Sequence, residues 1–129
     1  MVNIEVLLSD LENAVVKLEE ATGLPENIEI NRDGTIQRFE FTFELSWKLM
    51  KAIEDDQGVE AYGVKTIIRE AAKLGLIDDP LVWFEYLKAR NLASHTYNQT
   101  ISMEVYSNAK NFISVVKAFI TKAKYYLSK

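Results

Sequence analysis

The nine residues RNLASHTYN, from Arg90 to Asn98, hold the side chains of this chain that are best suited to chemistry on a phosphate. Arg90 supplies a permanently charged guanidinium that can bind two phosphate oxygens. His95 is the only histidine, and an imidazole can accept and donate protons near neutral pH. Such a pair could cleave RNA without a metal ion: the 2′-hydroxyl attacks the adjacent phosphate, His95 moves protons, and Arg90 stabilises the charge on the phosphoryl oxygens.

The spacing of these residues puts a condition on that chemistry. If residues 88–95 continue a helix, Arg90 and Ser94 lie one turn apart on one face, and Asn91 and His95 lie one turn apart on the neighbouring face. Arg90 and His95 themselves are about 140° apart around an ideal helix. They can therefore reach one ligand only if the helix ends near His95 or if a second chain contributes one of them.

A purely structural interpretation of the same residues competes with the catalytic one, because a match of two residues is a weak signal. Arg90 could pair with a carboxylate, His95 could close the C-terminus of a helix, and Asn98 could cap the next helix. Tyr97 could orient an RNA backbone, stack on a base or accept a modification on its hydroxyl. Periodicity alone does not separate these alternatives.

Hydrophobic periodicity predicts an all-α protein, an antiparallel up-and-down four-helix bundle with one additional short helix. The first long helix is expected from Asn3 to about Ala21. The stretch TGLPENIEINRDG follows as a loop, with a brief extended stretch at Ile28–Ile30 as an option. A second long helix is expected from Thr35, its cap, to about Asp55.

Glycines mark the third helix. Gly58 and Gly63 bracket a short break, after which apolar spacing predicts a shorter helix over residues 64–74. Gly75 is expected to end it as a left-handed C-cap.

The fourth helix is expected to start at Pro80, capped by Asp78 or Asp79, and to run into the RNLASHTYN stretch. After a cap at Asn98, the last helix reaches nearly to the C-terminus and is the longest element expected. The side chains of the fourth helix expected to face inward are Leu81, Phe84, Leu87 and Tyr86.

The second helix carries more aromatic residues than one face can bury. Phe39, Phe41, Phe43 and Trp47 fall within nine positions and cannot share one stripe at 100° per residue. We expect Phe39, Phe43 and Trp47 to belong to the core. The surplus apolar surface is then available to a partner.

Charged residues of the same helix favour structural roles. Arg38, Glu44 and Lys48 are expected to be solvated or salt-bridged. Glu40 and Glu44 lie one turn apart and could resemble a carboxylate pair, but no histidines match them. We therefore expect no metal site.

The composition limits the classes of function. With 129 residues, 48% of them hydrophobic, the chain is expected to form one domain over residues 1–129. The absence of cysteine excludes disulfides, thiolate catalysis and cysteine-ligated zinc. A net charge of −4 argues against a general nucleic-acid coat but leaves local basic sites open. Neither a membrane span nor a signal peptide is evident, so we expect a cytoplasmic protein. We also expect that it uses no cofactor.

Three stretches of the sequence resemble one known family. RNLASHTYN contains the Arg, four residues, His, one residue, Tyr motif of the HEPN superfamily, specifically of its nucleotidyltransferase substrate-binding branch. IQRFEFTFELSWKLMK, residues 36–51, resembles the signature of that branch's second helix. IIREAAKLGLIDDPLVWFEYLKARN, residues 67–91, resembles the segment that leads into the motif. The similarity covers essentially the whole chain.

The resemblance implies a HEPN-like bundle that forms homodimers and associates with a small nucleotidyltransferase encoded beside it. Some family members are toxins, metal-independent endoribonucleases whose catalytic Arg and His correspond here to Arg90 and His95. The partner is then the antitoxin, and in one branch it transfers AMP to the motif tyrosine, here Tyr97. Asn91 and Ser94 would support the phosphate or the histidine ring.

Two main hypotheses follow. The chain is either a ribonuclease toxin with an active site shared across a dimer, or a non-catalytic subunit that presents a substrate, such as RNA or a nucleotide, or a docking surface to the nucleotidyltransferase. A third, plainer alternative is a helical scaffold held together by the surplus aromatic residues of the second helix.

Overall fold

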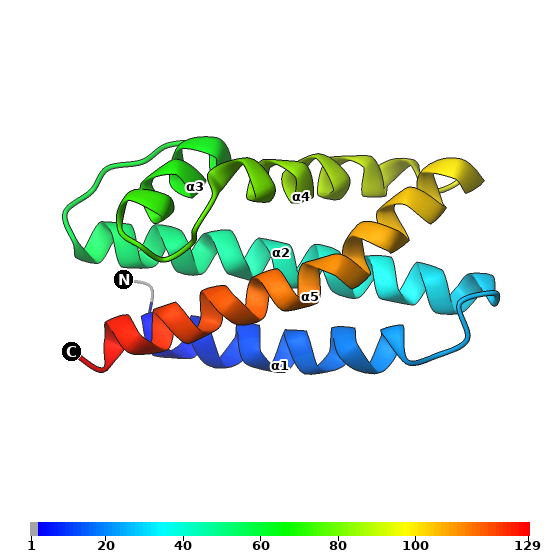
Figure 1. Cartoon of the computed structure of the whole chain (residues 1–129), viewed down its shortest axis with the longest axis horizontal. Helices are drawn as coiled ribbons and strands as arrows, with labels where there is room; N and C mark the ends of the chain where they lie inside the picture. The colour runs from blue at the N-terminus through cyan, green and yellow to red at the C-terminus, as the bar shows by residue number, and fades with distance from the viewer. Residues whose placement is uncertain (1–2) are drawn as a thin grey trace.

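The computed structural model describes residues 3–129 and folds them into an all-helical bundle (Figure 1). The start of α1 and the C-terminus lie at one end of the bundle, and the junction of α4 and α5, which contains η1, lies at the opposite end, where α2 begins. The expected bundle of four longer helices with one short extra helix is confirmed. Its elements are α1 (Ile4–Thr22), α2 (Glu29–Asp56), α3 (Val64–Lys73), α4 (Pro80–Leu92), the short 3₁₀ helix η1 (Ala93–His95) and α5 (Gln99–Leu127).

Side chains cap three of the helices where short-range patterns place a cap. Asn3 accepts a hydrogen bond from the Val6 amide at 3.2 Å, Asp79 from the Leu81 amide at 2.9 Å, and Asn98 from the Ile101 amide at 3.1 Å. Each satisfies one of the amides that the first turn of a helix leaves without a partner. The caps expected at Asp79 and Asn98 are thus confirmed, and α5 is the longest helix, as expected.

Gly75 ends α3 in the predicted left-handed conformation, with φ +79°. Its amide donates to the carbonyl of Ala72 at 3.1 Å, and the next amide, of Leu76, donates to the carbonyl of Ala71 at 2.9 Å. This pattern closes the last turn of α3 and redirects the chain toward α4.

The start of α2 differs from the prediction. The helix begins at Glu29, not at Thr35, so the loop predicted up to Gly34 is too long and Gly34 lies inside the helix. The optional extended stretch at Ile28–Ile30 is likewise wrong, since Glu29 and Ile30 are helical. Side chains of the first turns bind back to the preceding loop: Asn31 Nδ2 donates to the Pro25 carbonyl at 3.0 Å, and the buried Arg32 donates to the Glu26 carbonyl at 2.9 Å. These bonds offset the cost of a glycine within a helix.

Thr35 is consequently no cap. It is buried within α2, and its hydroxyl donates to the Asn31 carbonyl one turn earlier at 2.8 Å.

Aromatic rings from three helices form the centre of the core. The Phe112 ring of α5 meets the rings of Phe39 from α2 and Trp83 from α4 edge to face, each at a centroid distance of 5.3 Å. Phe43 packs with its centroid 6.0 Å from the same ring. This cluster fixes α2 and α4 against α5 and so determines which side chains of α2 and α4 can meet.

The inward face of α4 was predicted only in part. Tyr86 is buried, and Phe84 and Leu87 are half-buried against the core, but Leu81 is exposed to 66%. The buried face contains Trp83, and a residue two positions before it lies about 200° away around the helix, so Leu81 faces outward.

Two of the four aromatic side chains of α2 named above reach the surface, as expected from their number. Phe39 and Phe43 are fully buried, Trp47 is only half-buried, and Phe41 is 56% exposed. Trp47 packs against the core, as expected, but at its margin and not inside it. None of the helices described has the length and apolar character that a bilayer crossing demands.

Candidate functional site

The RNLASHTYN stretch forms the junction between α4 and α5. The α-helix ends at Leu92 and tightens into η1, whose last residue is His95. The amide of Asn98 donates to the His95 carbonyl at 3.1 Å, and the Asn98 side chain starts α5. The helix therefore ends at His95, which meets one of the two conditions under which Arg90 and His95 could reach a common ligand.

Arg90, in the last turn of α4, is paired with Glu44 of α2. Its Nε donates to Glu44 Oε1 at 2.6 Å, and the two side chains are 37% and 30% exposed. The second carboxylate oxygen of Glu44 accepts from the indole nitrogen of Trp47 at 3.1 Å. Glu44 thus holds the guanidinium by its Nε edge, so that no bond in residues 3–129 uses the two terminal nitrogens, which have the fork geometry suited to a phosphate.

A second carboxylate, Glu40, lies one turn before Glu44 near the same guanidinium. Burial raises the pKa of Glu40 above its ordinary value; the positive charge of Arg90 opposes this rise, and the negative charge of Glu44 adds to it. Two carboxyl groups, of Glu40 and Glu44, thus share a single cation, the guanidinium of Arg90.

His95 faces Tyr97 at the surface. Its Nδ1 lies 3.1 Å from the Tyr97 hydroxyl, and the two rings meet edge to face at a centroid distance of 5.8 Å. Tyr97 is 85% exposed and His95 is also exposed. Because Nδ1 is occupied by the hydroxyl, Nε2 is the ring nitrogen left for a proton transfer.

The single chain does not join Arg90 to His95. Within residues 3–129 no hydrogen bond or ion pair links them: Arg90 points to α2, and His95 to Tyr97. Asn91 and Ser94 are exposed, and the Ser94 hydroxyl donates to the Asn91 carbonyl at 3.1 Å. The structural alternatives hold for Arg90, which pairs with a carboxylate, and for Asn98, which caps α5; neither role prevents a further one.

A cleft of about 440 Å³ lies beside η1, between it and the first half of α2. Ala93 and Thr96 line one wall, and Glu40 and Gln37 lie on the α2 side. The cleft thus opens next to both Glu40 and the turn that carries His95.

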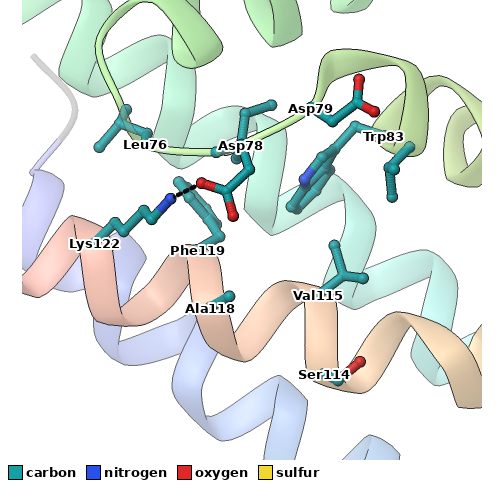
Figure 2. A pocket seen from close by; sticks show the side chains of 11 residues that line it. Leu76, Asp78, Asp79, Trp83, Ser114, Val115, Ala118, Phe119 and Lys122 are labelled. Atoms are coloured by element: carbon teal, nitrogen blue, oxygen red, sulfur yellow. Dashed lines mark hydrogen bonds and ion pairs between the residues drawn. The ribbon is translucent and has the colours of Figure 1, made fainter.

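A separate hollow of about 300 Å³ lies where the loop after α3 meets α5 (Figure 2). Trp83, Val115 and Phe119 supply its apolar wall, and Asp78 forms an ion pair with Lys122 across it. These two charged groups neutralise each other, and Asp79, which also lines the hollow, is used as the cap of α4, so the hollow offers little for chemistry. In the described part of the chain, no three His, Asp or Glu side chains gather as metal ligands would.

Sequence reasoning missed the role of Glu44 as the partner of Arg90. The residue was expected to be solvated or salt-bridged, and the second option is confirmed, but the cation it meets lies 46 residues away. A pair between residues so far apart in the sequence leaves no short-range spacing pattern that could have indicated it.

The helical bundle, with its polar motif at the α4–α5 junction, is that of a nucleotidyltransferase substrate-binding domain. Residues 7–125 match the model of the family described as nucleotidyltransferase substrate binding protein like. The chain belongs to this family, which confirms the resemblance noted from the sequence.

Individual relatives support the same family assignment. The chain is 41% identical over 113 residues to a Haemophilus influenzae protein named "Probable ribonuclease HepT", with 80% of this chain and 77% of the relative covered. A solved Haemophilus influenzae structure, described as revealing the fold of a substrate-binding domain of a nucleotidyltransferase, has a TM-score of 0.72, 34% identity and coverage of 95% and 99%. A crystal structure of a Thermus thermophilus protein has a TM-score of 0.81, 28% identity and coverage of 88% and 98%.

Proposed function

We propose that this chain is a metal-independent endoribonuclease, the toxin of a two-component module whose other member is a small nucleotidyltransferase. The observation that carries the proposal is an exposed histidine, His95, held by Tyr97 one short turn after the helix end that bears Arg90. The similarity to a protein named as a probable ribonuclease supports it.

The chemistry needs only groups on the protein and on the RNA. The 2′-oxygen of the RNA forms a bond to the adjacent phosphorus while the bond to the 5′-oxygen breaks, leaving a cyclic phosphate and a free 5′-hydroxyl. Imidazole Nε2 of His95 takes the proton of the 2′-hydroxyl and, as the imidazolium, gives it to the leaving 5′-oxygen. The terminal nitrogens of Arg90 stabilise the negative charge that grows on the phosphoryl oxygens.

A homodimer completes this site in the proposal. Within one chain Arg90 and His95 serve different neighbours, so a second copy placed against the α4–α5 junction would bring the arginine of one protomer toward the histidine of the other. Asn91 and Ser94, both exposed on the same junction, are proposed to support the bound phosphate or the histidine ring.

The nucleotidyltransferase is proposed to act as antitoxin by transferring AMP to Tyr97. The tyrosine oxygen would attack the α-phosphate of ATP and pyrophosphate would leave. Tyr97 is accessible at 85% exposure, and its hydroxyl contacts the ring of His95. An adenylyl group on that oxygen would remove the hydroxyl from His95 Nδ1 and place a bulky phosphodiester over the ring, so modification and inactivation would be one event.

The decisive experiment is RNA cleavage by the purified chain in the presence of EDTA. We expect cutting that the chelator does not reduce, with products ending in a cyclic phosphate. His95→Ala should abolish the cutting while circular dichroism shows an unchanged helical content, because His95 is exposed. Cleavage that survives His95→Ala in equally pure preparations would remove this residue from the mechanism.

A non-catalytic substrate-binding or docking subunit is the second candidate, favoured by the description of the solved relative as a substrate-binding domain and by the occupation of Arg90 by Glu44. Under this alternative the wild-type chain never cuts RNA but still binds the nucleotidyltransferase. Incubation of the two proteins with ATP, followed by mass spectrometry of this chain and of Tyr97→Phe, reports adenylylation independently of cleavage.

A further inference from the structure

A groove lies between α1 and α2. It has a volume of about 610 Å³, within the range of about 300–1,000 Å³ typical of ligand sites. We call it the α1–α2 groove and use six of its lining residues in the argument: Asp10 and Lys17 from α1, and Arg38, Phe41, Glu44 and Lys48 from α2.

The cations of the α1–α2 groove have no carboxylate partner. Seven ion pairs join other charged groups of residues 3–129, and none includes Lys17, Arg38 or Lys48. Arg38 instead donates to the backbone carbonyl of Lys17 at 2.7 Å, a bond that ties α2 to α1 and holds the cations together. Of the two lining carboxylates, Glu44 is already neutralised by Arg90, so Asp10 alone opposes these three positive charges.

An exposed aromatic ring lies among these cations. Phe41 is 56% exposed and lines the groove. Arg38 precedes it by three residues and Lys48 follows it by seven, so all three share one face of α2. A phenyl ring flanked by cations in a groove is the arrangement by which proteins bind single-stranded nucleic acid: the ring stacks on a base, and the cations bind the backbone.

Glu44 connects the α1–α2 groove to the candidate catalytic arginine. Glu44 lines the groove and also binds Arg90 with Oε1. An RNA strand in the groove would therefore pass Glu44, the residue that binds the guanidinium of Arg90. A phosphate of that strand beside Glu44 would lie near Arg90.

We propose that the α1–α2 groove binds a single RNA strand, with Phe41 stacked on a base and with Lys17 and Lys48 on phosphates, and so guides the strand toward Arg90. The inference rests on the proposed ribonuclease function for its choice of RNA. It also accounts for how a chain with a net charge of −4 could hold a polyanion: the unpaired cations are local, while most other cations are neutralised by carboxylates or lie apart.

The test measures binding without cleavage. A fluorescein-labelled 2′-O-methyl oligouridylate of about ten nucleotides cannot be cut by attack of its own 2′-oxygen, and its anisotropy reports the Kd of the full chain. Phe41→Ala should raise this Kd roughly 5- to 150-fold, the range that loss of one base–aromatic stack gives, and should leave its salt dependence unchanged.

The lysine variants should show a different signature. Lys17→Ala and Lys48→Ala should each weaken binding and also reduce the slope of log K against log salt concentration by about 0.7, the value for one phosphate contact on a single strand. Both side chains are exposed, so circular dichroism and thermal melting should match the wild type.

Two matched controls lie elsewhere on the surface. Tyr62 is an aromatic residue with 77% exposure outside the groove, and Lys65 of α3 is an exposed lysine that forms no ion pair within the described residues. Tyr62→Ala and Lys65→Ala should leave both the Kd and the salt slope as in the wild type.

The outcomes separate this inference from the proposed function. If the groove variants lose binding but natural RNA is never cut, the groove inference stands and the ribonuclease proposal fails. If natural RNA is cut by the wild type and the groove variants bind the oligouridylate as tightly as Tyr62→Ala does, the inference is overturned and the ribonuclease stands. A change in oligomeric mass of Phe41→Ala by light scattering, with unchanged Kd, would assign the groove to a second copy of the chain and also overturn it.

Discussion

Two acidic residues of α2, Glu44 and Glu54, lie in opposite environments, one with partners for its carboxylate and one without any in the described part of the chain. They lie ten residues, or about 15 Å, apart along the helix. Glu44 is 30% exposed and uses both oxygens, one for Arg90 and one for Trp47. Glu54 is fully buried, and within residues 3–129 neither of its oxygens has a hydrogen-bond partner.

Burial and neighbouring charges also change the pKa of Glu54. Burial is the main cause that raises the pKa of Glu54 from 4.5 to about 8, and the charge of Glu70 adds to the rise while the cation of Lys51 opposes it. Glu54 is thus mostly protonated at neutral pH, whereas Glu44 has a cation at 2.6 Å to balance its charge. A carboxylate with a partner can position a neighbouring arginine. One without a partner makes the stability of the bundle depend on pH.

The largest effect should come from breaking the Glu44 pair through Arg90→Ala. If the ribonuclease proposal holds, the rate of RNA cleavage should fall roughly 100- to 1,000-fold, as for the loss of one group that stabilises developing charge. The free energy of unfolding should change by at most about 1 kcal/mol, because the pair is partly exposed.

Cleavage assays and urea unfolding of the same preparation check both parts of this prediction. Lys88→Ala is the matched control, since Lys88 is an exposed cation two residues earlier in α4 with no ion pair in the described chain. Equal cleavage by Arg90→Ala and Lys88→Ala would show that the guanidinium has no part in the reaction.

The next effect concerns Glu54→Gln, which makes the buried group permanently neutral. In the unfolded chain Glu54 ionises near its ordinary pKa of 4.5, whereas the folded chain keeps the proton up to about pH 8. The unfolded state therefore binds fewer protons in this window, and stability falls as the pH rises through it. Between about pH 5.5 and 7.5 the wild type should lose up to roughly 3 kcal/mol through this group.

Urea unfolding at the two pH values measures the loss. Glu54→Gln should remove most of the pH dependence, and Glu44→Gln should retain it, because that variant still contains Glu54. If the wild type and Glu54→Gln lost stability in parallel, Glu54 would have to be ionised in the folded chain, and the contrast with Glu44 would disappear.

Features set by residues within a few positions were predictable from the sequence. The caps at Asp79 and Asn98 and the end of α3 at Gly75 depend on a side chain or a left-handed residue next to a helix end, and each is confirmed. The periodicity of the apolar residues predicted the bundle for the same reason, because helical spacing repeats over short distances.

Features set by tertiary contacts were not predictable. The start of α2 depends on Arg32 reaching the Glu26 carbonyl, which a loop-like composition hides. The Arg90–Glu44 pair depends on how the aromatic core fixes α4 against α2. The motif identified Arg90 and His95 as candidates, but their convergence depends on contacts beyond one chain and stays a prediction.

The smallest expected effect is a change in the pKa of Glu54 when a charge near it is removed. Lys51, one helical turn before Asp55, pairs with that residue at 2.8 Å, and its positive charge also lowers the pKa of Glu54. Lys51→Met removes this charge, so the pKa of Glu54 should move further above about 8. The carboxyl carbon shift of Glu54, followed by NMR as the pH is varied, reports that pKa directly. Lys124→Met, which breaks the distant pair with Glu12, should leave the titration of Glu54 in place. A Glu54 midpoint that stays fixed or falls in Lys51→Met would mean that Lys51 does not act on this carboxyl, and that burial with the charges of Glu70 and Asp55 sets its pKa.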